Sequence, residues 1–274
     1  MIVPDEEGIV LFREKVWAFY RECGRHDLPW RATTDPYCIF VSEVMLQQTQ
    51  VSRCLVKYPE FIRAFPDFPT LSAAPLVDLM KVWKGMGYNR RAIALKTTAE
   101  LVISCYQGVL PGNEQELQKL PGIGKATAAS IAAFAYNLPV VFIETNIRRV
   151  FIHCFFTGMA PVPDREIHPL VSATLDRENP REWYYALMDA GASLGKRIQN
   201  PNRRSAHYHV QTRFSGSLRQ IRGKVLGLLT GPDTLTIDDI AARTGEDPMR
   251  IRCIVQALEQ EGFLVTEGNW VHMR

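Results

Sequence analysis

Apolar side chains recur every three or four residues through roughly the first two hundred positions, and this spacing limits the fold more than any other feature. The opening segment shows it, with Ile9, Phe12, Val16 and Tyr20 one helical turn apart. Such a period places an apolar stripe along one helix face, whereas a half-buried strand alternates strictly. No set of alternating β-branched segments competes, so the sequence predicts an all-α body. Further helices are expected over residues 40–51, 60–65, 76–83, 91–106, 114–120, 126–136 and 146–156.

The composition is that of a folded, water-soluble chain. Of 274 residues, 46% are hydrophobic and 22% charged, which excludes disorder as the main state and a fibrous protein. The length suits one large domain or two smaller ones. No apolar run approaches the length of a membrane span, and residues 1–7 lack the basic start and apolar run of a signal peptide. We therefore expect a cytoplasmic protein.

The cysteines stand singly along the chain. No two have C-x-x-C spacing, and no Cys/His cluster matches a zinc or iron–sulfur pattern. We expect reduced, mostly buried thiols and no metal held by cysteine. The six positions are Cys23, Cys38, Cys54, Cys105, Cys154 and Cys253.

The pattern changes from about Ser217. A helix is expected over 218–229, a second begins at the capping pattern of Thr236, and a third covers 247–261. Residues 263–266 and 269–272 then suit the two strands of a hairpin. This order predicts a winged-helix-like module. Such modules contact DNA or other proteins, and both roles stay open, although Arg250 and Arg252 on the third helix favour DNA.

A basic stretch lies between Lys196 and Lys224. It carries eight Lys or Arg and no Asp or Glu, which leaves −5 for the remainder of a chain whose net charge is +3. Such a concentration, with aromatic residues interleaved, indicates a polyphosphate partner; a solvated loop without a partner is the alternative.

Three segments carry groups suited to chemistry. Residues 120–127 (LPGIGKAT) have two glycines between helical patterns, which suits a hairpin whose amides hold a phosphate, or a plain helix–helix turn. Glu43 lies inside an otherwise apolar helix, where it acts in a site or faces solvent. Glu144 follows an apolar run and precedes a helix with two arginines, where it acts in a site or caps the helix.

Together these segments resemble the helix-hairpin-helix superfamily of DNA base-excision glycosylases, most closely the MutY-type adenine glycosylases. The resemblance covers about 28–195. It implies a two-lobed, all-α HhH-GPD fold, with a barrel lobe at about 30–137, a second lobe from 1–29 plus 138–215, and the winged-helix-like α+β module at 216–274. Its strongest marks are residues 29–31 (PWR), 35–37 (DPY), 42–50 (SEVMLQQTQ), 85–88 (GMGY), 120–127 and 146–150.

The resemblance also implies roles for single residues. Glu43 would protonate a flipped adenine at N7 and later activate water, and Glu144 would stabilise the positive charge that develops on the sugar. Glu43 then needs a raised pKa, while the other acid stays ionised. The base pocket would comprise Trp30, Arg31, Leu46, Ala126 and Asn146. Gln48, Thr49, Met86 and Tyr88 would enter the duplex and touch the base left behind. DNA phosphates would meet Gly122, Gly124, Lys125, Thr127, Arg148, Arg203 and Arg204.

Four departures from the family pattern refine these expectations. Glu144 stands where the family has Asp, so its carboxylate must be aimed differently. Residues 196–214 contain no cysteine, so we expect the family's [4Fe–4S] cluster to be absent and the basic residues 201–204 to replace its loop. A winged-helix pattern stands where the family has its C-terminal domain for oxidised guanine, so we expect that domain to be missing. Ala126 stands where bifunctional relatives carry a lysine nucleophile, so no β-lyase activity is expected.

The sequence thus predicts a monofunctional, monomeric glycosylase that acts on double-stranded DNA and associates with the nucleoid through it. Adenine opposite 8-oxoguanine or guanine is the expected substrate, and the hairpin is a candidate site for a monovalent cation when DNA is bound. Two alternatives stay open. One is a glycosylase for uracil or thymine opposite guanine, and the other is a non-catalytic DNA-binding protein in which Glu144 reflects lost chemistry.

Overall fold

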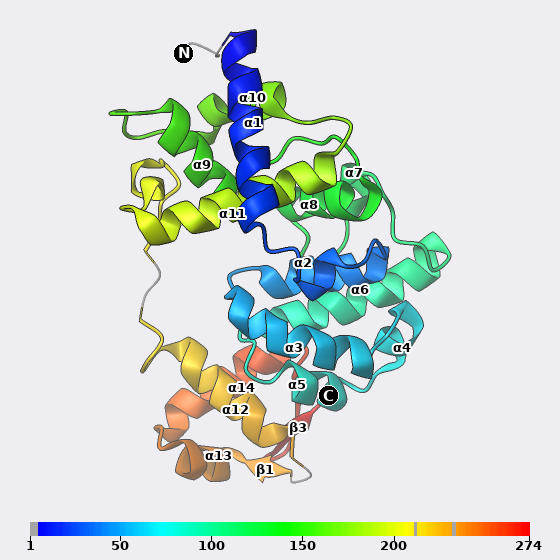
Figure 1. Ribbon diagram of the computed structural model, residues 1–274. Helices are drawn as coiled ribbons and strands as arrows, with labels where there is room; N and C mark the ends of the chain where they lie inside the picture. The colour runs from blue at the N-terminus through cyan, green and yellow to red at the C-terminus, as the bar shows by residue number, and fades with distance from the viewer. Residues whose placement is uncertain (1–4, 211–212, 232–233) are drawn as a thin grey trace. The chain divides into compact units, whose positions relative to one another are not determined.

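The computed structural model describes residues 5–210, 213–231 and 234–274 (Figure 1). The expectation that the chain begins without a signal peptide falls partly on residues 1–4, outside the described residues. The N-terminal helices are α1 (Glu6–Cys23), η1 (Pro29–Arg31), α2 (Pro36–Leu46), α3 (Val51–Ala64), α4 (Phe68–Ala73), α5 (Leu76–Trp83) and α6 (Arg90–Tyr106). They are followed by α7 (Glu114–Leu117), α8 (Lys125–Tyr136), α9 (Thr145–Phe155), α10 (Asp164–Thr174), α11 (Pro180–Arg197) and η2 (Pro201–Arg204). The C-terminal part contains α12 (Leu218–Leu229), β1 (Leu235–Thr236), α13 (Ile237–Thr244), α14 (Pro248–Gln260), β2 (Leu264–Glu267) and β3 (Trp270–Met273).

Contacts divide the chain into two compact units. Unit 1 comprises Met1–Glu43, Pro111–Lys119 and Ile123–Val210, and unit 2 comprises Val44–Leu110, Leu120–Gly122 and Gln211–Arg274. These boundaries differ from the expected lobes. Residues 30–43, 111–119 and 123–137 join the terminal segments, and the C-terminal module joins residues 44–110. The chain therefore crosses between units inside α2, just after Glu43, and inside the glycine hairpin.

In unit 1 the long helix α11 packs against α1, α8 and α9. Its face carries Trp183 and Tyr184, both fully buried, so this helix supplies part of the core of unit 1. At Gly191 a side chain would stand 2.2 Å from the carbonyl oxygen of Asn146. Only glycine therefore lets α11 approach the first turn of α9, the turn that Glu144 precedes.

In unit 2 the helix boundaries differ from those expected between residues 40 and 65. Helix α2 ends at Leu46 because Gln48 takes a positive φ of 52°. Helix α3 begins at Val51 and continues to Ala64, with Pro59 in its interior. Proline removes one backbone hydrogen bond. The apolar face of α3, with Cys54, Tyr58 and Phe61 buried, compensates for that loss.

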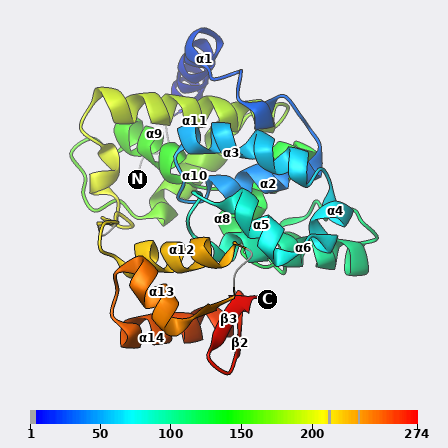
Figure 2. The same cartoon turned by 90° about the horizontal axis from the view of Figure 1, so that it is seen from below.

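The C-terminal module has the order α12, β1, α13, α14, β2, β3 (Figure 2). Its sheet has the order β1–β3–β2 with antiparallel pairing, for example Val265 opposite His272. The capping pattern is confirmed, since Thr236 Oγ1 accepts from Asp239 N at 3.1 Å and the Asp239 carboxylate accepts from Thr236 N at 2.9 Å. The order of helices and strands predicted for the winged-helix-like module is therefore confirmed.

The cysteines are all free, and the expectation that most are buried is wrong. Cys54 is buried, Cys38 is intermediate, and Cys23, Cys105, Cys154 and Cys253 are exposed.

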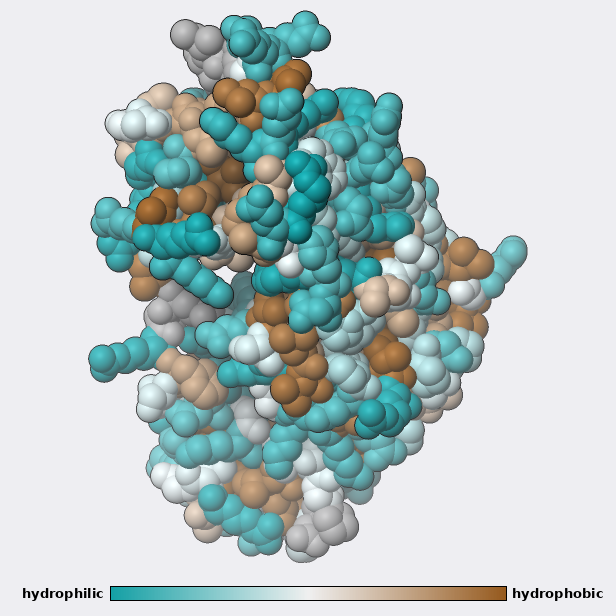
Figure 3. Space-filling model, viewed as in Figure 1, coloured by the Kyte–Doolittle hydropathy of each residue, from teal (hydrophilic) through white to brown (hydrophobic). Residues whose placement is uncertain are grey.

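Hydrophilic residues predominate on the face shown in Figure 3. Within the described ranges, no helix is both long and apolar enough to cross a membrane, and no three His, Cys, Asp or Glu side chains gather as a metal site.

Candidate active site

Glu43 lies on α2 within unit 1 and is half-buried. Its Oε2 accepts a hydrogen bond of 2.6 Å from Ser130 Oγ on α8. Loss of hydration on burial raises the pKa of Glu43 to about 7, against the opposing effect of the Ser130 bond. The interpretation of Glu43 as a solvent-facing residue is therefore wrong. Near neutral pH, a large share of this carboxyl holds its proton and can donate it.

Glu144 is the N-cap of α9. Its Oε1 accepts from Asn146 N at 2.6 Å and Ile147 N at 2.8 Å, and its Oε2 lies 3.3 Å from Asn146 Nδ2. The capping interpretation is thus correct. The two backbone N–H groups orient the glutamate side chain, as they would orient the shorter side chain of a capping aspartate. Burial raises the pKa of Glu144, while the two backbone bonds oppose that change by favouring the charged form.

The two acids act on each other across unit 1. The negative charge of Glu144 contributes to the raised pKa of Glu43, and the positive charge of Arg31 opposes it. Glu43 has a hydroxyl partner, whereas Glu144 has three N–H donors that stabilise a carboxylate. This asymmetry provides one acid able to give a proton and one able to stay ionised, the division of roles that cleavage of a glycosidic bond requires.

Arg31 is held by Asp189, a buried carboxylate on α11. Arg31 Nη1 and Nη2 donate to Asp189 at 2.8 and 2.9 Å, and the guanidinium lies 4.3 Å above the ring centre of Tyr185. Arg25 adds bonds of 2.7 Å from its backbone N and 2.6 Å from its Nε. These bonds from Arg31 and Arg25 hold the pKa of Asp189 below its usual range despite burial. The cluster fixes Arg31 near Glu43, so the arginine supplies a positioned charge.

Sequence reasoning missed Ser130 and Asp189. Both had a detectable signal: Ser130 interrupts an alanine-rich helix, and Asp189 is the acid within the apolar run of α11. A polar side chain on a helix's buried stripe needs a partner, so each could have been selected as a site residue.

The expected base-pocket residues have different surroundings. Trp30 is 4% exposed, and Asn146 is half-buried, with its Oδ1 accepting from Arg149 Nη1 at 2.9 Å. Ala126 is exposed on the first turn of α8. All three belong to unit 1 with the two acids, whereas Leu46 is half-buried at the end of α2 in unit 2.

The residues expected to enter the duplex lie in unit 2 and fall into two groups. Gln48 and Tyr88 are exposed and take positive φ angles of 52° and 47°, which non-glycine residues rarely adopt. Thr49 is half-buried, and its Oγ1 accepts from Arg91 at 3.0 Å. Met86, in contrast, is 1% exposed. The expectation that Met86 touches DNA is therefore corrected: its side chain belongs to the core.

The buried side chain of Arg91 bonds to both segments, the one around Gln48 and the one around Tyr88. Arg91 is 8% exposed, and its guanidinium donates to the carbonyls of Val44, Met45 and Gln47 at 2.7–3.0 Å. It also donates to the carbonyls of Met86 and Gly87 at 3.2 and 3.1 Å. One buried guanidinium thus fixes the two segments that present Gln48 and Tyr88.

The residues expected to contact DNA phosphates differ in backbone conformation and in exposure. Gly122 has a φ of 75° and needs to be glycine, whereas Gly124 is the extended N-cap of α8, with φ −83°. Only one of the two glycines therefore serves the turn by its positive φ. Lys125 and Arg203 are exposed, and Thr127 is half-buried.

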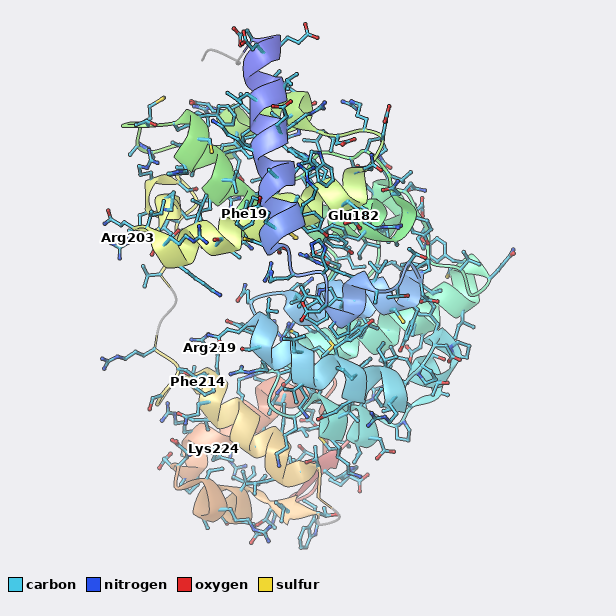
Figure 4. The ribbon with its side chains drawn as sticks, in the orientation of Figure 1. Phe19, Glu182, Arg203, Phe214, Arg219 and Lys224 are labelled. Atoms are coloured by element: carbon cyan, nitrogen blue, oxygen red, sulfur yellow. The ribbon has the colours of Figure 1, made fainter. Side chains whose placement is uncertain are left out.

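The other two arginines have protein partners. Arg148 forms a two-pronged pair with Asp164, at 2.7 and 2.6 Å. Arg204 donates to the carbonyls of Ile152 and Phe156 at the end of α9, the first at 3.0 Å. In Figure 4, Arg203 lies at the edge of the view, and it is the exposed member of the 201–204 turn. A cluster held by cysteine does not fit this segment, which has no thiol and is fixed by Arg204 and by Asn202 Nδ2 donating to Thr145 O.

Comparison with known proteins identifies the family of this chain. The family model "HhH-GPD superfamily base excision DNA repair protein" matches residues 41–167. An adenine DNA glycosylase of Mycolicibacterium smegmatis is 34% identical over 229 residues, which cover 77% of this chain and 78% of that protein. The chain belongs to the HhH-GPD superfamily of base excision DNA repair proteins.

A further relative and two solved structures each match between 68% and 72% of the chain. An adenine DNA glycosylase of Buchnera aphidicola is 35% identical over 68% of this chain. The chain spans about half the length of that relative, 53%. A solved structure of a thermostable thymine-DNA glycosylase superposes with a TM-score of 0.62 and 25% identity, over 72% of this chain and 92% of that one. An endonuclease III–DNA complex superposes with a TM-score of 0.57 and 17% identity over 68% of this chain and 85% of that one, which shows the shared fold.

Proposed function

We propose that this HhH-GPD protein is a monofunctional DNA glycosylase that hydrolyses the N-glycosidic bond of an adenine flipped out of a mismatch, opposite guanine or 8-oxoguanine. The observation that carries the proposal is the pair of acids in unit 1. Glu43 has a pKa of about 7 through burial, and Glu144 is held by N–H donors that favour its ionised form. The adenine DNA glycosylases among the relatives support the choice of base.

The reaction follows from the states of these two acids. Protonated Glu43 gives its proton to N7 of the flipped adenine, which makes the base a neutral leaving group as the C1′–N9 bond breaks. Ionised Glu144 stabilises the oxocarbenium-like charge on the sugar. Water then adds to C1′, and Glu43, now a carboxylate, takes the proton that the water loses. The products are free adenine and an abasic site.

We expect no strand cleavage because of the residues on the first turn of α8. A lyase needs an amine that forms a Schiff base with the sugar. Ala126 has no such group, and Lys125 is exposed on the first turn of α8, where it suits a phosphate. Exposed Lys125 and Arg203, with the hairpin amides, would hold the backbone of double-stranded DNA without reading sequence. A monomer suffices, because both acids come from one chain, and no cofactor takes part in the steps above. Binding to chromosomal DNA would keep the protein at the nucleoid in the cytoplasm.

Thymine or uracil opposite guanine is the second candidate. It is favoured by the likeness to the thymine-DNA glycosylase and by the small, exposed Ala126, which leaves room for a different base.

A panel of mismatched duplexes in single-turnover assays tests the proposal. We expect release of adenine opposite guanine or 8-oxoguanine, and loss of that release in Glu43→Gln with duplex binding nearly intact. Borohydride should trap no covalent adduct on abasic DNA. Release of thymine or uracil alone would establish the second candidate. Release of no base from any duplex would leave a DNA-binding protein, and cleavage retained in Glu43→Gln would remove Glu43 from the mechanism.

A further inference from the structure

The winged-helix-like module is fixed to the rest of unit 2 beside Tyr88. Glu261, which follows α14, accepts from Arg90 of α6 at 2.6 Å and also from Arg222 of α12. The Glu261 side chain is 14% exposed, whereas that of Arg90 is 75% exposed, so the bridge lies at the surface of unit 2. Arg219 of α12 donates from Nη1 to Tyr88 Oη at 3.0 Å and lies 5.9 Å from the centre of the ring. The module therefore extends the surface that presents Gln48 and Tyr88.

A pocket of about 820 Å³ lies at this junction, within unit 2. One wall is the loop Gly85–Asn89 with Gln48, and the other is α12 with the residues just before it. Four of its lining side chains are cationic, and among the described residues that line it none is acidic. These cations are Arg53, Lys84, Arg219 and Lys224. A pocket of this size and charge suits an anionic ligand of one or two nucleotides.

The aromatic lining narrows the chemistry of the ligand. Phe214 is 60% exposed and Tyr88 is 37% exposed, and both line the pocket, with Phe214 just before α12 (Figure 4). Exposed aromatic rings among cations stack on nucleic-acid bases, while the cations meet phosphates. An arginine carries donors in a fork that matches O6 and N7 of guanine. The lining thus suits a guanine-type nucleotide better than a peptide or lipid.

The third helix of the module, α14, carries the two arginines that were expected to favour DNA. Arg250 is paired at 2.8 Å with Glu246, which precedes the helix, so one of the two already has a protein partner. Two of the three basic residues of α12, Arg219 and Lys224, line the pocket.

We propose that this pocket binds the nucleotide opposite the excised base, and that α12 supplies the opposite-base specificity through Arg219. This rests on the proposed function in one respect, that a base is flipped from a duplex held near Gln48 and Tyr88. Guanine offers both O6 and N7 as acceptors to the guanidinium, whereas the 8-oxo form, which carries a hydrogen on N7, offers O6. The module then does more than stabilise the fold, because its first helix completes a binding site.

Equilibrium binding to non-cleavable duplexes tests this proposal. The flipped position holds 2′-fluoro-2′-deoxyadenosine, and the opposite position holds guanine or 2,6-diaminopurine, which has an amino group in place of O6. We expect the wild-type chain to prefer guanine by about tenfold, since a two-pronged arginine contact discriminates bases by a factor of this order. In Arg219→Ala the ratio should fall to near one. Arg219→Lys should keep most of the affinity for both duplexes, with a smaller preference for guanine, because a lysine can donate to O6 but lacks the fork.

The matched control is Arg63→Ala, an exposed arginine of unit 2 on α3 that does not line the pocket. It should keep the tenfold ratio. A ratio unchanged in Arg219→Ala, or lost equally in Arg63→Ala, overturns the proposal, as does a ratio fully kept in Arg219→Lys. Urea unfolding of each variant shows whether the module remains folded, and Phe214→Ala, which removes only an exposed ring, should weaken binding to both duplexes several-fold.

The assay separates this proposal from the proposed function because it needs no cleavage. A wild-type chain that releases no base but shows the Arg219-dependent preference refutes the glycosylase and supports the pocket. A chain that releases adenine but shows no Arg219-dependent preference supports the glycosylase and refutes the pocket.

Discussion

Replacement of Glu43 by Gln should make the protein more stable, by an amount that grows with pH. Burial raises the pKa of Glu43 from 4.5 to about 7, so the folded state holds a proton that the unfolded state releases. The folded state therefore loses stability, relative to the unfolded state, as pH rises from about 4.5 to about 7. Gln cannot ionise, and its side-chain oxygen can still accept from Ser130 Oγ, so the variant escapes this loss.

The magnitude follows from linkage between protonation and folding. One pKa unit corresponds to about 1.4 kcal/mol. A carboxyl shifted from 4.5 to about 7 loses roughly 2.5 kcal/mol of folding free energy between pH 5 and pH 8. The difference in the free energy of unfolding between Glu43→Gln and the wild type should grow by that amount. Contributions of the titratable groups that do not interact with Glu43 cancel in the difference.

Urea unfolding at a series of pH values measures this difference. Glu178→Gln, at an exposed carboxylate, is the control and should track the wild type throughout. The same carboxyl should govern base release by the wild type, which should decline as pH rises through 7 because the proton donor is lost. A difference between Glu43→Gln and the wild type that stays constant within about 0.5 kcal/mol from pH 5 to pH 8 would refute the raised pKa.

Three further substitutions test the supports of the site. Arg91→Met removes the buried donor to several loop carbonyls and should cost about 3 kcal/mol or more in urea unfolding; a loss under about 1 kcal/mol would show that the loops hold themselves. Asp189→Asn leaves the Arg31 charge without its carboxylate and should cost about 3–5 kcal/mol, measured in the same way; a stability equal to the wild type would contradict the buried pair. Ser130→Ala removes the bond that lowers the pKa of Glu43, so that pKa should rise and the alkaline decline of base release should move to higher pH in single-turnover rates. A decline at the same pH would mean that the hydroxyl does not act on Glu43.

Much of the local structure could be predicted from the sequence, because its causes lie within a few residues. The spacing of apolar residues determined the helices, and residues 76–83 and 218–229 begin and end where expected. The capping box at Thr236 depends on a residue three positions away. Glu43 and Glu144 could be selected because an acid beside an apolar run is unusual and because the surrounding motifs match a family. Gln48 ends α2 by its positive φ, which the period of apolar residues does not encode.

The tertiary structure decided which of these residues work together. Ser130 stands 87 residues after Glu43 and Asp189 stands 158 residues after Arg31, so no local pattern could pair them. Met86, expected at the DNA, is 1% exposed in the folded chain, and Arg219 of α12 reaches Tyr88 only through the packing of unit 2. A helix face follows from neighbours three or four positions apart, whereas a pKa and a partner depend on which distant side chains displace water from a group.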